Sequence, residues 1–187
     1  TTPLATRGNV AFFGCLGYEL DLKHLLPVEI KEVKAQIAFY KQYRDIFQYG
    51  TFTRTNLGWQ VTDGTTTLAG VFHGLVHAAP GYEQLRLLGL DAGKTYQLRT
   101  RAQKIRIGQF AHLMKHVLPV KLNPEGALLR TADKHYGLDD GVEGYRVSGA
   151  ALGSGILLQP SFRGTGYDKN QRTQGDYGAN LYIIEEV

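Results

Sequence analysis

The rest of this chain is organised around residues 15–50, CLGYELDLKHLLPVEIKEVKAQIAFYKQYRDIFQYG. The first part of this stretch, Cys15–Leu20, is short and mostly apolar, as a buried strand is. Pro27 then marks the start of a helix, because the N–H that proline lacks is not used at the first helical position. Gly50 marks the end, since glycine adopts the left-handed conformation after a helix without strain. The sequence therefore predicts a strand followed by a helix over residues 27–49.

The predicted helix has one apolar side. Its apolar residues recur at helical spacing with basic residues between them; they are Ile30, Val33, Ile37, Tyr40 and Phe47. One short strand cannot cover a stripe of this length, and the segment before Cys15 is too short to form a sheet. We therefore expect the chain to begin inside a domain. The last strand–helix unit of a (β/α)8 barrel would need such missing neighbours.

After Gly50 the pattern changes from helical spacing to short alternating segments. Asp63-Gly64 is a hairpin-turn pair between two of them. Strands are expected at residues 59–62, 68–76, 83–88, 96–99, 105–107, 145–147 and 181–184. Many short strands with frequent turns are typical of antiparallel sandwiches. The predicted fold is mostly β: residues 1–50 form the last strand–helix unit of a (β/α)8 barrel, and residues 51–187 form a C-terminal antiparallel β-sandwich domain.

The composition is that of a soluble globular protein, with 43% apolar residues in a chain of 187 and no long uncharged apolar run. The formal net charge is +4, and the densest basic run contains Arg99, Arg101, Lys104 and Arg106. We interpret this run as the solvent face of a strand pair, because no nucleic-acid-binding motif accompanies it. The single Cys15 excludes an intramolecular disulfide. We expect a cytoplasmic protein without nucleic-acid or membrane partners.

Two pairs of histidines have the spacing of metal ligands on a helix. His112 and His116 lack both a glutamate at the following position and an obvious third ligand. His73 and His77 have the same spacing in a predicted strand, where four residues span roughly 13 Å, too far to share a metal. The sequence therefore predicts no metal site and no cofactor.

The remaining candidate chemistry lies in the Cys15–Leu20 segment and just after it. Glu19 and Asp21 fall on one face of an extended chain, roughly 6–7 Å apart at Cα, a separation that paired carboxylates of glycosidases can use. Such a pair more often marks the solvated end of a strand. No serine or cysteine lies in a nucleophile elbow, and the Gly164–Tyr167 segment lacks the context of a phosphate loop. Taken alone, the sequence displays no active site.

Three stretches together resemble the C-terminal end of bacterial family-36 glycoside hydrolases, the α-galactosidases or melibiases of clan D. TPLATRGNV (residues 2–10) is similar to the segment after the seventh barrel strand of that family. GYELDL (17–22), followed by QIAFYK (36–41) and QYG (48–50), is similar to the eighth strand and its helix. FRGTGY (162–167) and GDYGANLY (175–182) are similar to the terminal motif. The middle of the chain, roughly 55–160, carries less that matches.

The resemblance implies an α-galactosidase that removes terminal α-galactose from sugars of the melibiose and raffinose type. Such enzymes retain the anomeric configuration through a covalent intermediate on one aspartate, with a second aspartate as acid and base. Both aspartates of the family lie on earlier barrel strands, so the resemblance places no catalytic residue in this chain. Glu19 and Asp21 would then be candidates for the barrel rim, where strand C-termini carry the site. The implied partners are the rest of the barrel, the sugar and possible further copies of the enzyme.

Two alternatives concern a module that works alone. Flat aromatic rings stack on sugars, so exposed rings would indicate a carbohydrate-binding module, although aromatic residues more often fill cores. The candidates are Trp59, Tyr82, Tyr136, Tyr145 and Tyr167. The second alternative is a sandwich that serves as an interface in oligomer assembly.

Overall fold

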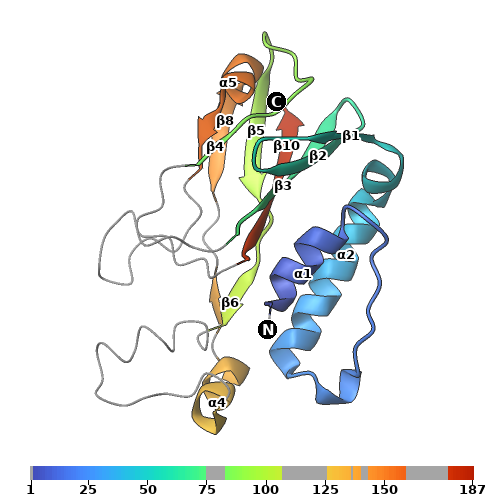
Figure 1. Ribbon diagram of the computed structural model, residues 1–187, viewed down its shortest axis with the longest axis vertical. Helices are drawn as coiled ribbons and strands as arrows, with labels where there is room; N and C mark the ends of the chain where they lie inside the picture. Colours follow the sequence, from blue (N-terminus) through green and yellow to red (C-terminus); the bar gives the residue numbers. More distant parts are fainter. Residues whose placement is uncertain (1, 75–82, 107–125, 136, 140–142, 159–176) are drawn as a thin grey trace, which may run out of the picture.

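The computed structural model describes residues 2–74, 83–106, 126–135, 137–139, 143–158 and 177–187 (Figure 1). Two helices come first, α1 (Leu4–Ala11) and α2 (Pro27–Tyr49), and a single 3₁₀ turn, η1 (Leu22–His24), lies between them. The strands are β1 (Thr51–Arg54), β2 (Gly58–Thr62), β3 (Thr66–Phe72), β4 (Gln84–Leu85), β5 (Thr95–Thr100), β6 (Lys104–Arg106), β7 (Gly137–Asp139), β8 (Gly144–Ser148), β9 (Ile156–Leu157) and β10 (Ala179–Glu186). Two further helices of the described ranges are α4 (Ala127–His135) and α5 (Gly149–Ser154).

The main sheet has six strands in the order β1-β2-β3-β10-β5-β8, and all neighbouring strands are antiparallel. The last strand of the chain, β10, lies in the middle of this sheet between β3 and β5 (Figure 1). Successive side chains of a strand point to opposite faces. Leu181 and Ile183 of β10 therefore belong to one core, and Tyr182 and Ile184 to the other.

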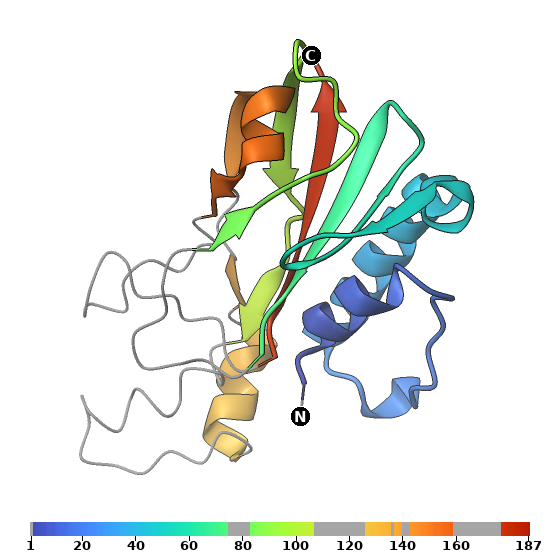
Figure 2. The ribbon, with the colours of Figure 1, turned by 45° about the horizontal axis from the view of Figure 1, so that its top comes forward.

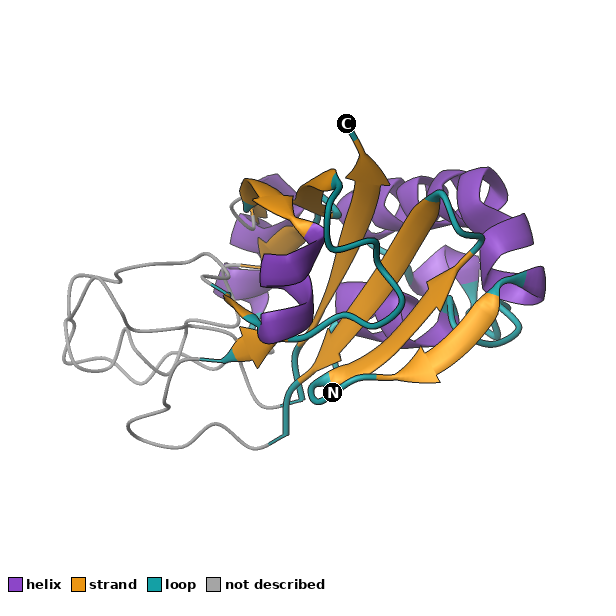
Figure 3. Ribbon diagram, turned by 90° about the horizontal axis from the view of Figure 1, so that it is seen from above, coloured by secondary structure: helices purple, strands orange, loops and turns teal. Residues whose placement is uncertain are grey.

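Helices α1 and α2 cover one face of the main sheet (Figures 2 and 3). Phe12, at the end of α1, is fully buried and packs on Phe39 and Phe47 of α2 at ring-centroid distances of 5.1 and 5.8 Å. On the sheet side, this core is formed by buried side chains of β2, β3 and β10. These side chains are Val61, Leu68, Leu181 and Ile183. The three elements thus share one aromatic-rich core.

The opposite face of the sheet is covered by α5 and by the two-stranded sheet β4–β9 (Figure 3). Leu85, Leu87, Leu152 and Leu158 come from this second layer and are buried against strands β3, β5 and β10. Ser148 caps α5, because its hydroxyl accepts a hydrogen bond from the Ala151 N–H. The fold is therefore mostly β, with an antiparallel sheet between two layers. The prediction of an antiparallel β domain that follows a helix is confirmed.

The predicted strand Cys15–Leu20 is wrong for this structure, in which the segment has no regular secondary structure. A strand needs a neighbour for its backbone hydrogen bonds, and no strand of the described ranges pairs with it. The predicted helix 27–49 is confirmed as α2, with Pro27 first and the Glu29 carboxylate accepting from the Leu26 N–H at 2.8 Å. The prediction that Gly50 adopts a left-handed conformation is wrong, because its φ of −69° and ψ of 165° are those of an extended residue. Gly50 is needed for space, since a Cβ there would lie 2.5 Å from the Ile46 carbonyl oxygen.

The prediction that the chain itself leaves the apolar side of α2 uncovered is wrong. The later strands of the chain cover its Val33–Phe47 side, because β2, β3 and β10 contribute to the core that holds Tyr43 and Phe47. Ile30 and Ile37 remain 37% and 36% exposed. The sequence argument failed because it considered only the strand before the helix. Among the described helices, none is both long and apolar enough to traverse a lipid bilayer.

Candidate functional site

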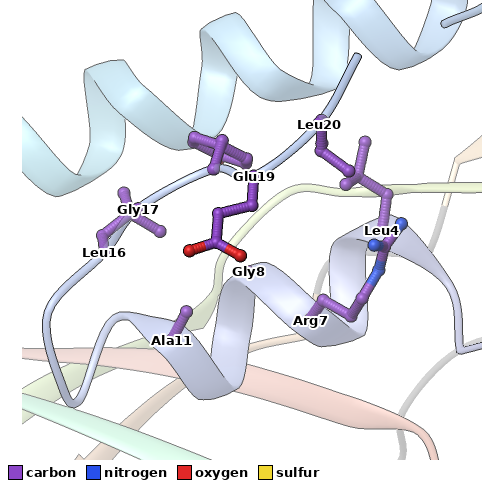
Figure 4. Close-up of a pocket in the computed structure, with 9 residues that line it drawn as sticks. Leu4, Arg7, Gly8, Ala11, Leu16, Gly17, Glu19 and Leu20 are labelled. Atoms are coloured by element: carbon purple, nitrogen blue, oxygen red, sulfur yellow. The ribbon is translucent and has the colours of Figure 1, made fainter. Parts of the chain in front are cut away.

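A pocket of about 230 Å³ lies between α1 and the extended segment that follows it (Figure 4). Its lining residues are Leu4, Arg7, Gly8, Ala11, Leu16, Gly17, Tyr18, Glu19 and Leu20. Glu19 points into this pocket toward the α1 residues Gly8 and Ala11 (Figure 4). Within the described part of the chain, no hydrogen bond or ion pair is formed by its carboxylate. Glu19 and Arg7 are thus the charged residues of a lining that is otherwise mostly apolar.

Asp21, the second predicted rim residue, has a local structural contact. Its carboxylate accepts a hydrogen bond from the Lys23 N–H at 3.0 Å and so caps η1. His24 Nε2 lies 3.4 Å from its other oxygen, in a pair that is exposed on both sides. Asp21 is not among the residues that line the pocket with Glu19. The two carboxylates therefore do not share one hollow in this chain, and a rim role for either stays a prediction.

A buried polar network lies directly behind the pocket. The Arg101 guanidinium donates to Glu32 Oε1 at 3.0 Å and to Asn9 Oδ1 at 3.1 Å. Glu32 Oε1 also accepts from Gln36 Nε2 at 2.8 Å, and Gln36 Oε1 accepts from the Tyr18 hydroxyl at 2.6 Å. Every one of these hydrogen bonds joins groups that are at least partly buried. The network links the β5–β6 connection, the helices α1 and α2, and the pocket segment.

Arg101 is held by apolar contacts as well as by charge. Its side chain is 4% exposed, and the guanidinium carbon lies 5.3 Å from the Phe12 ring centroid and 5.4 Å from that of Phe39. Asn9, fully buried in α1, extends the network by donating to Gln103 Oε1 at 2.9 Å and to the Ala179 carbonyl at 2.8 Å. A buried charge needs this degree of pairing, because an unpaired one is very costly.

The network changes the acidity of Tyr18. Burial raises the pKa of its hydroxyl, the Arg101 charge opposes this, and the Glu32 charge adds to the rise, so that the pKa lies above the ordinary value. Tyr18 therefore stays protonated and able to donate its hydrogen bond to Gln36 at neutral pH.

The basic run predicted to form a solvent face is only partly exposed. Arg101 is a buried member of the network, and Arg99 is partly exposed, donating to Glu185 at 3.2 Å and to the Tyr43 hydroxyl at 3.1 Å. Burial alone would lower the pKa of Arg99, but the Tyr43 and Glu185 contacts outweigh it and raise the pKa. Lys104 lies exposed in β6. Arg99 and Arg101 thus form hydrogen bonds and ion pairs with other side chains of the protein and so stabilise the fold.

The histidine and aromatic candidates separate into those that the structure describes and those outside it. His73 Nδ1 lies 3.1 Å from Glu83 Oε1, and its buried Nε2 has no hydrogen-bond partner in the described ranges. His77, His112 and His116 lie outside the described residues, as do Tyr82, Tyr136 and Tyr167. No cluster of three potential metal ligands occurs among the residues that are described.

The two described aromatic candidates for sugar stacking have contacts within the protein. Trp59 packs on Phe72, Phe13 and Phe52 with centroid distances of 4.6, 5.8 and 6.1 Å. Tyr145 packs against the core that α5 covers and donates its hydroxyl to a Glu143 carboxylate oxygen. Both rings therefore act in packing, as aromatic residues in cores generally do.

Sequence reasoning missed the buried network behind the pocket. Glu32 and Gln36 are four residues apart and therefore share a helix face, which was the available signal. The contacts of Arg101 with Glu32 and with Asn9, however, join residues that are separated by 69 and by 92 positions in the sequence. Such distant pairing has no local signature.

Comparison with known proteins assigns both parts of the chain to the same enzymes. The family model Melibiase matches residues 1–50, and the family model Glycosyl hydrolase family 36 C-terminal domain matches residues 57–184. Two curated relatives are "Alpha-galactosidase AgaA" of Geobacillus stearothermophilus, 38% identical over 104 residues, and "Alpha-galactosidase Mel36A" of Lactobacillus acidophilus, 36% identical over 104 residues. Each alignment covers 51% of this chain and 14% of the relative. The chain therefore spans only a small part of their length.

Solved structures agree with this assignment. The α-galactosidase from Lactobacillus brevis superposes with a TM-score of 0.64 at 26% identity, over 100% of this chain and 20% of that one. A family-36 α-galactosidase, AgaA from G. stearothermophilus, solved in complex with raffinose, gives 0.63 and 26% over the same shares. The model of the C-terminal domain covers more than half of the chain and agrees with these structural neighbours. The chain therefore belongs to glycosyl hydrolase family 36 and contains the C-terminal domain of that family.

Proposed function

We propose that this chain is the C-terminal part of an α-galactosidase that hydrolyses terminal α-galactosides of the melibiose and raffinose type. The observation that carries the proposal is the order of the two family matches, Melibiase over residues 1–50 and the C-terminal domain over residues 57–184. Relatives solved with raffinose and with stachyose support the class of sugar. Residues 1–50 are proposed to close a (β/α)8 barrel, and residues 51–187 to form the domain that packs on it.

The geometry of the pocket segment supports this role. The segment 15–20 is extended but has no strand beside it in the described ranges, and Glu19 points into a hollow lined on its other side by α1. An extended segment that follows a helix and precedes another is what a barrel strand would be, once neighbouring strands supply its hydrogen bonds. We propose that Glu19 and Asp21 then lie at the barrel rim, where such barrels bind their substrates.

The catalytic chemistry is proposed to lie outside these 187 residues. In the retaining mechanism, one carboxylate attacks the anomeric carbon while a second carboxylic acid protonates the departing oxygen, and water then releases the sugar from the first. We propose that preceding barrel strands supply both aspartates and that this chain contributes support and the rim. A cytoplasmic location belongs to the same proposal, and the single Cys15 is compatible with it.

The test compares the chain with a polypeptide that also contains the preceding barrel. The chain alone is expected to give no turnover of p-nitrophenyl α-galactoside, and the longer polypeptide is expected to cleave it and raffinose. Proton NMR of the first product should show the α anomer, as retention requires. Turnover by the pure chain, or an inactive folded longer polypeptide, would contradict the proposal.

Cys15 provides a second readout. It is exposed in this chain and should react rapidly with iodoacetamide. In the longer polypeptide the same thiol should be protected, because a barrel strand is covered on both faces. Equal labelling rates in both proteins would argue against a strand at this position.

A further inference from the structure

We propose that Arg101 is a positioning residue that fixes Tyr18, and with it the adjacent Glu19, through a relay of two side chains of α2. The relay runs from Arg101 to Glu32, then to Gln36, then to the Tyr18 hydroxyl. That Glu19 belongs to a sugar-binding rim rests on the proposed function, but the relay itself does not. The inference gives the C-terminal sheet a role in setting the geometry of the pocket.

The direction of every hydrogen bond in the relay follows from the Glu32 carboxylate, which Arg101 holds in place. A guanidinium can only donate, so Glu32 must accept. A carboxylate that accepts from Arg101 also accepts from Gln36, so Gln36 must turn its NH₂ group toward Glu32 and its oxygen toward Tyr18. The Tyr18 hydroxyl must then donate, as its 2.6 Å contact with Gln36 Oε1 shows. Arg101 thus fixes the place of the Glu32 carboxylate, and that carboxylate sets the orientation of Gln36 and, through it, of the Tyr18 hydroxyl.

Burial makes this selection strict. Gln36 is completely buried, and its NH₂ group also donates to the Leu4 carbonyl at 3.1 Å, so both amide protons have partners. A flipped amide would bring its oxygen against the Glu32 carboxylate and the Leu4 carbonyl, which are two acceptors. Buried polar groups without partners are costly, and water does not reach Gln36 to replace the lost bonds. The Tyr18 ring is therefore held in one place.

Arg99 offers a matched comparison for Arg101. It is also an arginine of the β5 region that donates to a glutamate, Glu185, and to a group of α2, the Tyr43 hydroxyl. Neither of these contacts leads to Tyr18. If the effect of Arg101 were only general stabilisation of the α2–sheet contact, removal of Arg99 would act on Tyr18 in the same way. If the relay transmits position, only Arg101 matters.

The test uses the whole chain labelled with tyrosine that carries ¹³C at the ζ carbon. Tyr18→Phe identifies the Tyr18 signal, and Arg101→Met, Arg101→Lys and Arg99→Met are compared with the unmodified chain. Arg101→Met should move the signal toward that of free tyrosine, because the Glu32 carboxylate is then no longer held beside Gln36 and the relay loses its anchor. Arg101→Lys should move it less, since an ammonium group can still donate to Glu32. Arg99→Met should leave it in place.

Each outcome is decisive. A Tyr18 signal at its original position in folded Arg101→Met protein overturns the inference, and so does an equal shift in Arg99→Met. If Arg101→Met does not fold, Arg101→Lys is read in the same way, with an unchanged signal overturning the inference. This readout requires no activity: an inactive longer polypeptide would refute the proposed function and leave the relay standing. In an active one, Arg101→Lys should raise KM for raffinose more than it lowers kcat, since the relay reaches only the rim.

Discussion

Replacement of Gly8 by alanine tests the packing behind the pocket. Alanine in a helix interior normally stabilises by about 1 kcal/mol relative to glycine, so propensity alone predicts a gain. A Cβ on Gly8 would, however, lie 2.5 Å from Cδ and Oε1 of Gln36. Gln36 is completely buried and cannot move away without losing its bonds to Tyr18, Glu32 and the Leu4 carbonyl. Because each such bond contributes about 1 kcal/mol, we expect Gly8→Ala to lower the free energy of unfolding by about 2 kcal/mol.

The measurement is urea unfolding of Gly8→Ala and of two comparison variants. Gly17→Ala is the matched control, because Gly17 lines the same pocket and its added Cβ would meet no atom within 4 Å. Its stability should be unchanged or slightly higher. In a Gln36→Ala background the obstacle is gone, so the further change Gly8→Ala should be neutral or stabilising by up to about 1 kcal/mol. An equal loss in both backgrounds would refute the reasoning.

Two further predictions concern other parts of the fold. Gly149→Ala should strongly destabilise the protein in a thermal melt, because its Cβ would lie 2.0 Å from the Asp91 carbonyl oxygen; Gly153→Ala in the same helix should not, because the nearest atom there is 3.9 Å away. Partial burial alone would raise the pKa of Asp63, but hydrogen bonds from the backbone of Thr66 and its neighbour lower it overall. Asp63 therefore stabilises the fold above its unfolded pKa of about 3.9 and ceases to do so as the pH falls through the lower folded value. Asp63→Asn should flatten the loss of stability in acid urea titrations, and an unchanged slope would contradict this.

The parts of the fold that sequence predicted correctly have local causes. The helix 27–49 carries its own start at Pro27 and its own apolar periodicity. The Asp63-Gly64 turn is equally local, because Gly64 has a φ of +94° that glycine adopts without strain. Several predicted strands appear with shifted ends, such as β3, which ends at Phe72 where we expected residue 76. In each case the residues that define the element lie within it.

The parts that sequence missed depend on distant contacts. β1 has an exposed, polar pattern and becomes a strand because Phe52 pairs with Val61 across a hairpin. Cys15–Leu20 has a strand-like composition, and lacks a partner in the described chain. Of the residues that line the pocket, the sequence singled out only Glu19 as a candidate. The contact of Arg101 with Glu32 behind the pocket joins residues far apart in the sequence, so no local pattern predicts it. Composition indicates what a segment can become, and the available neighbours decide what it becomes.

The boundary at residue 50 stays a prediction, and we do not expect it to separate two independently stable units. Removal of residues 1–50 would uncover Leu68, Leu181 and Ile183 on one face of the central sheet, since their core partners on that side are mostly in α1 and α2. It would also remove Glu32 and Asn9, the hydrogen-bond partners that hold the Arg101 guanidinium in the whole chain. We therefore expect residues 51–187 alone to aggregate or to bind the dye ANS, while the whole chain unfolds cooperatively in urea. A monomeric 51–187 fragment that unfolds at the same urea concentration as the whole chain would show that the sheet is stable without α1 and α2. The inference that the core shared by the helices and the sheet stabilises the fold would then be refuted.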